Sequence, residues 1–226
     1  MRHLSTRLRK DRYMRTVQLI MALMFNFLLI IIEGATFLKV KNKLNILKFY
    51  TFLQNFIALA ISILFCGFAI IELLGYGNVP ELIKGLRYTA TCGLAATMFV
   101  FAFFLAPRFK SGKSKSHTDL FGGLEPKKAN LLLHYICPII SIVSFLLFER
   151  GTVLTDSEWT GYAAIPSCTY WAIYIFLTIT HLWKEPYGLT ASRTERKNHL
   201  IGILLLIAIP ALFILLSYVL YWLNLI

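Results

Sequence analysis

Long apolar runs alternate with short polar segments along the whole chain. Each run is close to the roughly 20 helical residues that cross about 30 Å of bilayer hydrocarbon. A helix is the expected form, because it satisfies its own backbone hydrogen bonds where water is absent. The runs cover about residues 16–38, 49–74, 86–106, 130–148, 160–183 and 200–223. The pattern predicts an all-α polytopic membrane bundle of about six transmembrane helices, forming one integral membrane domain over residues 1–226.

The amino-acid composition agrees with a membrane protein and narrows its chemistry. Hydrophobic residues make up 58% of the chain and charged residues 15%, against about 45–50% and about 25% in soluble domains. The formal net charge of +12 comes from Lys and Arg that flank the runs, so membrane lipids are the expected partner and nucleic acid is not. The four cysteines lie within apolar runs without metal-ligand spacing, which predicts no metal and no organic cofactor.

An even number of spans places both ends of the chain on one side of the membrane. We name this side A and the opposite side B. Lys and Arg are more numerous in the segments on side B, which favours side B as cytoplasmic. The dense basic tail at residues 2–15 lies on side A and favours the reverse orientation. The charge pattern therefore leaves the orientation open.

Polar residues in the second and fourth runs recur at helical spacing. Thr51, Asn55 and Ser62 share one face of the second run, and Asn130 and His134 share one face of the fourth. Such polar stripes are expected to face neighbouring helices rather than lipid. Both runs start on side B, so Thr51 and His134 should lie at similar depth, about one turn below that surface. An ionisable residue within a span is a functional candidate by default, which draws attention to His134.

Two further polar residues lie near the same surface. Glu33 is close to the side-B end of the first run, and His181 is close to the side-B end of the fifth. A hydroxyl, two imidazoles and a carboxyl group are therefore expected to converge beneath side B. A hydroxyl group is a poor nucleophile until a base takes its proton, so these groups together contain what an activated nucleophile needs.

A structural interpretation exists for these residues as well. Thr51 can bond a carbonyl of its own helix, as threonines in membrane helices commonly do. Asn55 fits an interhelical hydrogen bond. His181 precedes Leu-Trp-Lys, an ordinary interfacial sequence. Glu33 can pair with a basic residue such as Lys39. The sequence alone leaves both interpretations open.

Several segments together resemble a known family. They are Lys48–Asn55 (KFYTFLQN) at the head of the second run, Asn130–Pro138 (NLLLHYICP) at the head of the fourth, Leu86-Arg87 at the third and Pro186-Tyr187 after the fifth. This set is similar to the androgen-induced protein family and its bacterial six-helix relatives. The resemblance extends from about Phe49 to Tyr187.

The resemblance implies a fold and an activity. Characterised animal members of that family are six-span hydrolases that cleave fatty acid esters of hydroxy fatty acids with a Thr nucleophile and a His. The matching positions in this chain are Thr51 and His134. The likeness to bacterial members implies the plasma membrane of a bacterium as the location.

The leading hypothesis is an intramembrane lipid-ester hydrolase with a lipid ester as its substrate. Thr51 attacks the ester carbonyl and His134 moves the proton, while Asn55 donates to the oxyanion. His181 or Glu33 orients the base, and Asn130 occupies a supporting or substrate-binding position. The alternatives are a small multi-pass transporter, a non-catalytic membrane scaffold, or a chaperone or assembly factor.

Overall fold

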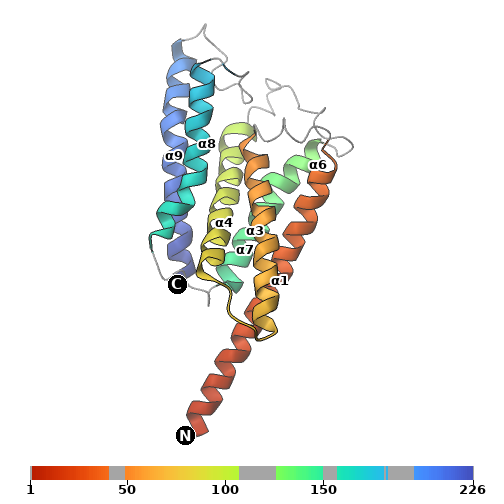
Figure 1. Ribbon diagram of the computed structural model, residues 1–226. Helices are drawn as coiled ribbons and strands as arrows, with labels where there is room; N and C mark the ends of the chain where they lie inside the picture. Colours follow the sequence, from red (N-terminus) through yellow and green to blue (C-terminus); the bar gives the residue numbers. More distant parts are fainter. Residues whose placement is uncertain are drawn as a thin grey trace.

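The computed structural model describes residues 2–40, 49–106, 126–149, 157–180, 182 and 196–225. Within these ranges the chain is almost entirely helical and contains no strand (Figure 1). The elements are α1 (Arg2–Leu38), α3 (Tyr50–Leu73), α4 (Glu81–Val100), η1 (Phe101–Leu105), α6 (Pro126–Leu131), η3 (Leu132–Ile136), α7 (Cys137–Val143), η4 (Ser144–Phe148), α8 (Trp159–Ile179) and α9 (Arg196–Leu225). The all-α bundle predicted from the sequence is confirmed.

Six helical segments of the described chain are long and apolar enough to cross a membrane. They are Arg12–Leu38, Tyr50–Leu73, Glu81–Phe103, Lys128–Phe148, Trp159–Ile179 and Ile207–Leu225. The protein is therefore a multi-pass integral membrane protein. The third segment begins at Glu81, about one turn before the start expected near residue 86, and this places Arg87 well inside the helix.

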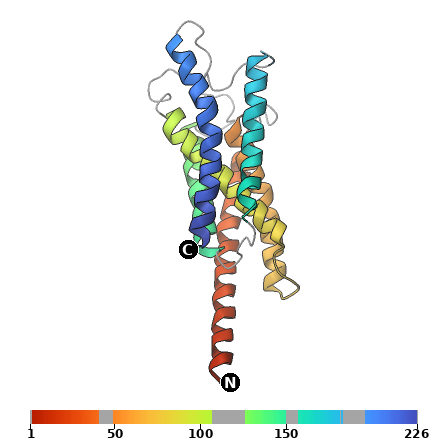
Figure 2. The ribbon, with the colours of Figure 1, turned by 90° about the vertical axis from the view of Figure 1, so that its left-hand side faces the viewer.

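Helix α4 lies in the middle of the bundle and packs against α3, α7, α8 and α9. Helix α1 packs against α3 and the fourth segment, while α8 and α9 pair with each other on the far side of α4 (Figure 1). The N-terminal end of α1 extends beyond the other helices (Figure 2). Polar side chains on α4 therefore meet other helices rather than lipid.

The fourth membrane segment is one continuous helix made of α6, η3, α7 and η4. Its η3 part is a π-helical turn, in which the N–H of Cys137 donates to the carbonyl of Leu132. Pro138 follows directly and has no N–H to give the carbonyl of His134 in an α-helical pattern. A π turn widens the helix and re-pairs the backbone, and such turns are frequent at functional sites. Here the turn contains His134.

A glycine brings α3 and α4 into close contact. A Cβ atom added to Gly93 of α4 would collide with the side chain of Gln54 on α3. Gln54 is buried, so it has little room to move aside. The missing side chain therefore sets the separation of these two helices at the depth of the polar stripe on α3.

Candidate functional site

Thr51 and His134 are in direct contact. The Oγ1 atom of Thr51, at the second position of α3, lies 3.0 Å from Nε2 of His134 in η3. Their exposed fractions are only 6% and 7%. The convergence expected from the shared depth of the two helix starts is therefore observed for this pair.

The other ring nitrogen of His134 determines which way this hydrogen bond runs. Nδ1 lies 3.1 Å from the backbone carbonyl oxygen of Asn130, one turn earlier. A carbonyl oxygen only accepts, so Nδ1 carries the proton and Nε2 of the neutral ring is an acceptor. The hydroxyl of Thr51 consequently donates to Nε2. This is the arrangement of a hydroxyl with a base that a third group orients.

The group that orients His134 differs from the expected ones. It is the backbone carbonyl of Asn130, whereas the sequence suggested the side chain of His181 or Glu33. Asn130 was selected for its side chain, but its contribution comes from the main chain. His181 lies outside the described residues.

The imidazole ring of His134 packs against an aromatic side chain that the sequence did not single out. The ring centroids of His134 and Phe101 are 3.8 Å apart. Phe101 opens η1, the π-helical end of the third membrane segment. Leu133 and Phe52 belong to an apolar cluster on adjoining turns of the two site helices. The ring of Phe101 therefore covers part of the imidazole of His134.

Asn55 does not act in the way the sequence suggested. Its Nδ2 group donates to the carbonyl of Thr51 at 2.7 Å and to the carbonyl of Leu133 at 3.4 Å. Both N–H bonds are therefore engaged, and none remains for an oxyanion. The bond to Leu133 joins α3 to η3, as the structural interpretation expected. The Oδ1 atom of Asn55 is buried and has no partner among the described residues.

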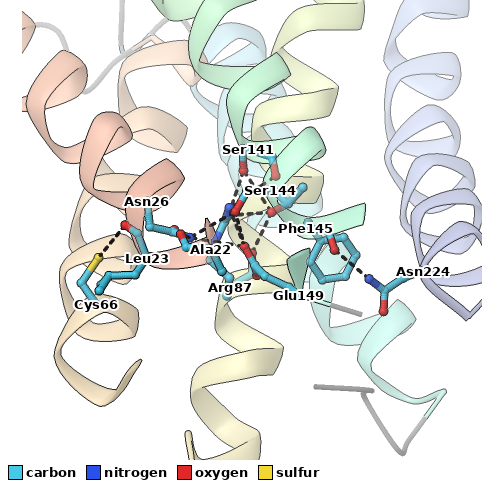
Figure 3. Close-up of polar contacts among 11 residues, drawn as sticks. Ala22, Leu23, Asn26, Cys66, Arg87, Ser141, Ser144, Phe145, Glu149 and Asn224 are labelled. Atoms are coloured by element: carbon cyan, nitrogen blue, oxygen red, sulfur yellow. Dashed lines mark hydrogen bonds and ion pairs between the residues drawn. The ribbon is translucent and has the colours of Figure 1, made fainter. Parts of the chain in front are cut away.

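A second polar cluster lies deeper in the bundle and was not predicted. Arg87 of α4 is fully buried, and its Nη2 atom lies 3.3 Å from Oε1 of Glu149 (Figure 3). The guanidinium group also donates to the hydroxyls of Thr91 at 2.7 Å and Ser141 at 2.8 Å. Hydrogen bonds from Ser144 at 2.7 Å and Asn26 at 3.3 Å complete the surroundings of the Glu149 carboxylate. The members come from α1, from α4 and from the end of the fourth membrane segment, and Figure 3 shows them converging.

Glu33 occupies a position that contradicts a simple ion pair with Lys39. Its side chain is fully buried and neither carboxylate oxygen has a hydrogen-bond partner among the described residues, whereas Lys39 is exposed. Glu33 therefore lies inside the bundle without a hydrogen bond to Lys39 or to His134, so neither its expected pairing nor its expected orienting role is present.

No metal centre is formed in the part of the chain that the structure describes, where no three His, Cys, Asp or Glu side chains gather. The fold and the site together define a six-helix integral membrane protein with a buried Thr–His pair above a buried ion pair. In comparisons with known proteins, no protein-family model matched the chain, and neither did a curated protein or a solved structure.

Proposed function

We propose that this protein is an intramembrane lipid-ester hydrolase with Thr51 as the nucleophile and His134 as the general base. The observation that carries the proposal is the 3.0 Å contact from Thr51 Oγ1 to His134 Nε2. The carbonyl of Asn130 holds the proton on the far nitrogen, so the near nitrogen is ready to accept. A threonine that bonded only a backbone carbonyl of its own helix would have no base beside it.

The reaction proceeds in two halves. Thr51 Oγ1 attacks the ester carbonyl carbon while His134 Nε2 takes the hydroxyl proton. The bond to the alcohol oxygen then breaks, that oxygen takes the proton from His134, and the hydroxylated product leaves. Water next attacks the acyl group on Thr51, His134 takes one proton from it, and that proton returns to Oγ1 as the fatty acid leaves.

The depth of the pair favours a lipid substrate. Thr51 is in the first turn of α3, so the pair lies near the side-B surface but within the bundle. An ester near the headgroups can reach it while its acyl chains remain in hydrocarbon. Fatty acid esters of hydroxy fatty acids fit this description, and the family resemblance favours them. The same resemblance favours the plasma membrane of a bacterium.

The test is an ester-hydrolysis assay on the purified protein in nanodiscs. Thr51→Ala and His134→Ala are expected to lose activity by at least about a hundredfold, as for loss of a nucleophile or general base. Thr51→Ser keeps a hydroxyl and should retain measurable activity. Thr97→Ala is the matched control, since Thr97 is a buried membrane threonine that bonds only the carbonyl of Gly93 on its own helix. Equal activity in all variants contradicts the proposal.

A small transporter is the second candidate, and one observation favours it. Arg87, Glu149 and Glu33 place three ionisable groups inside the bundle, as transport pathways do. A fluorophosphonate probe separates the two functions. Labelling that disappears in Thr51→Ala supports hydrolysis. No labelling, together with solute uptake into proteoliposomes that Glu33→Gln abolishes, supports transport.

A further inference from the structure

Buried polar atoms without a partner gather on the inner faces of the first three membrane helices. Among the described residues they are Asn26 Oδ1, Glu33 Oε1 and Oε2, Gln54 Nε2, Asn55 Oδ1, Ser62 Oγ and Arg87 Nε. In folded proteins nearly all buried polar groups are bonded to protein or to ordered water. Because these unpartnered atoms lie together in one part of a membrane bundle, they indicate a ligand that they share.

The register of α1 against α3 places these atoms at two levels. The thiol of Cys66 approaches the carbonyl of Leu23 at 3.9 Å, which fixes the antiparallel pairing (Figure 3). Each residue advances the helix by about 1.5 Å. Ten residues on from Leu23, Glu33 is therefore level with about residue 56 and adjoins Asn55. By the same count Asn26 is level with Ser62, two turns deeper.

The fourth membrane segment gives the same two levels independently. Asn26 Nδ2 lies 3.4 Å from Ser144 Oγ, and the two helices run in opposite directions. Seven residues along each helix bring Glu33 level with Cys137. Asn55 in turn contacts the carbonyl of Leu133, one turn before Cys137. The upper level therefore lies directly below the Thr51–His134 pair.

The chemistry of the unpartnered atoms identifies the class of ligand. The unpartnered oxygens of Glu33 and Asn55 include acceptors, whereas the unpartnered Nε of Arg87 is a donor. A bound cation would satisfy the acceptors but not Arg87. An apolar chain would satisfy neither. Water donates and accepts, and buried water typically makes about three such bonds.

We propose that Glu33 and Asn55 bind water beneath Thr51 and that this water hydrolyses the acyl-threonine intermediate. The inference rests on the proposed hydrolase function. Asn55 Oδ1 accepts one O–H bond and keeps the water one turn below the acyl carbon. The water oxygen attacks that carbon as His134 Nε2 takes a proton, and the Thr51–acyl bond then breaks as that proton passes to Thr51 Oγ1. Glu33 holds the next water and bridges it to Arg87, so water reaches the site from within the bundle.

The water itself is tested without any substrate by X-ray hydroxyl-radical footprinting of the full chain in nanodiscs. Cys137 is the reporter, because thiols oxidise readily and its side chain lies at the level of Glu33. Cys92 is the control, since it lies in an apolar cluster and, at 4% exposed against 0% for Cys137, is no less accessible. We expect Cys137 to be oxidised several-fold faster than Cys92. Equal protection of both thiols overturns the water site.

The role of the water is tested by burst kinetics with a long-chain p-nitrophenyl ester. The Glu33→Leu side chain has a similar volume but cannot bind water. The first acylation burst should therefore persist, whereas the steady-state rate should fall on the order of tenfold. A loss of this size is expected when one charge-assisted hydrogen bond is removed. Glu33→Gln keeps two polar atoms and should retain the faster rate, and it replaces Glu33→Leu as the informative variant if the latter does not fold. Phe27→Leu, on the lipid-facing side of the same helix, should change neither phase.

The two experiments separate the possible failures. The inference is supported if Cys137 is oxidised more slowly in Glu33→Leu than in the wild type and the variant also deacylates slowly. Oxidation of Cys137 with an unchanged deacylation rate in Glu33→Leu means that the water is not the hydrolytic one and overturns the inference. If the wild type has no esterase activity, the proposed function fails and takes the catalytic role with it, while footprinting still decides whether water binds.

Discussion

Removing the charge of Arg87 is expected to destabilise the protein far more than removing the charge of an exposed arginine. The side chains of Arg87 and Glu149 are 1% and 3% exposed, and their charged atoms lie 3.3 Å apart. Arg87→Met keeps most of the length of the side chain but leaves the Glu149 carboxylate buried without its counter-charge. Breaking a buried pair in this way typically costs about 3–5 kcal/mol. We expect a loss of that size in the free energy of unfolding.

The matched control is an ion pair in the same bundle with different exposure. Arg15 on α1 lies 2.8 Å from Glu72 on α3, but its side chain is 48% exposed. Exposed pairs contribute about 0–1 kcal/mol, so Arg15→Met should cost no more than that. Reversible unfolding in mixed detergent micelles, followed by circular dichroism, measures both variants on one scale.

A double variant tests whether the penalty comes from the unpaired carboxylate. Arg87→Met combined with Glu149→Gln leaves neither member of the pair charged, so it should recover part of the stability that Arg87→Met loses. The recovery is the coupling between the two side chains. Equal costs for Arg87→Met and Arg15→Met, or no recovery in the double variant, would refute the assignment of a buried, mutually dependent pair.

Two further predictions concern helix packing. Gly93→Ala should lower the free energy of unfolding by about 1–3 kcal/mol, because the added Cβ meets the buried Gln54 side chain. At the control position Gly67 nothing lies within 4 Å, so Gly67→Ala should leave the free energy of unfolding unchanged or raise it by up to about 1 kcal/mol. Equal shifts in the melting temperature of the two variants would contradict this difference. Tyr50→Phe should cost about 1 kcal/mol by removing the 2.6 Å hydrogen bond to Ser167 that joins α3 to α8, and an unchanged thermal transition would show that this bond adds no stability.

The fold and the central pair of the site follow from simple features of the sequence. Bilayer thickness fixes the length of an apolar helix, so six runs are enough to predict six spans. Counting spans then places the starts of the second and fourth helices on one side. Thr51 and His134 are each close to such a start, and two residues at equal depth on inward faces have few other partners. Depth therefore makes the two residues a candidate pair, and the packing of α3 against η3 brings them into contact.

The deeper cluster could not be predicted in the same way, because it depends on where helices end and how they widen. Arg87 is the second residue of the third predicted run and Glu149 directly follows the fourth. Charged residues at such positions ordinarily lie at the membrane interface. Helix α4 starts at Glu81, so Arg87 is more than one and a half turns inside it. At the end of the fourth membrane segment, Glu149 directly follows the π-helical turn η4. Its carboxylate accepts the hydrogen bond of Ser144 and lies in the interior. Each charge is buried only because the other is present at that depth, and this mutual dependence is a property of the packed bundle that neither run displays alone.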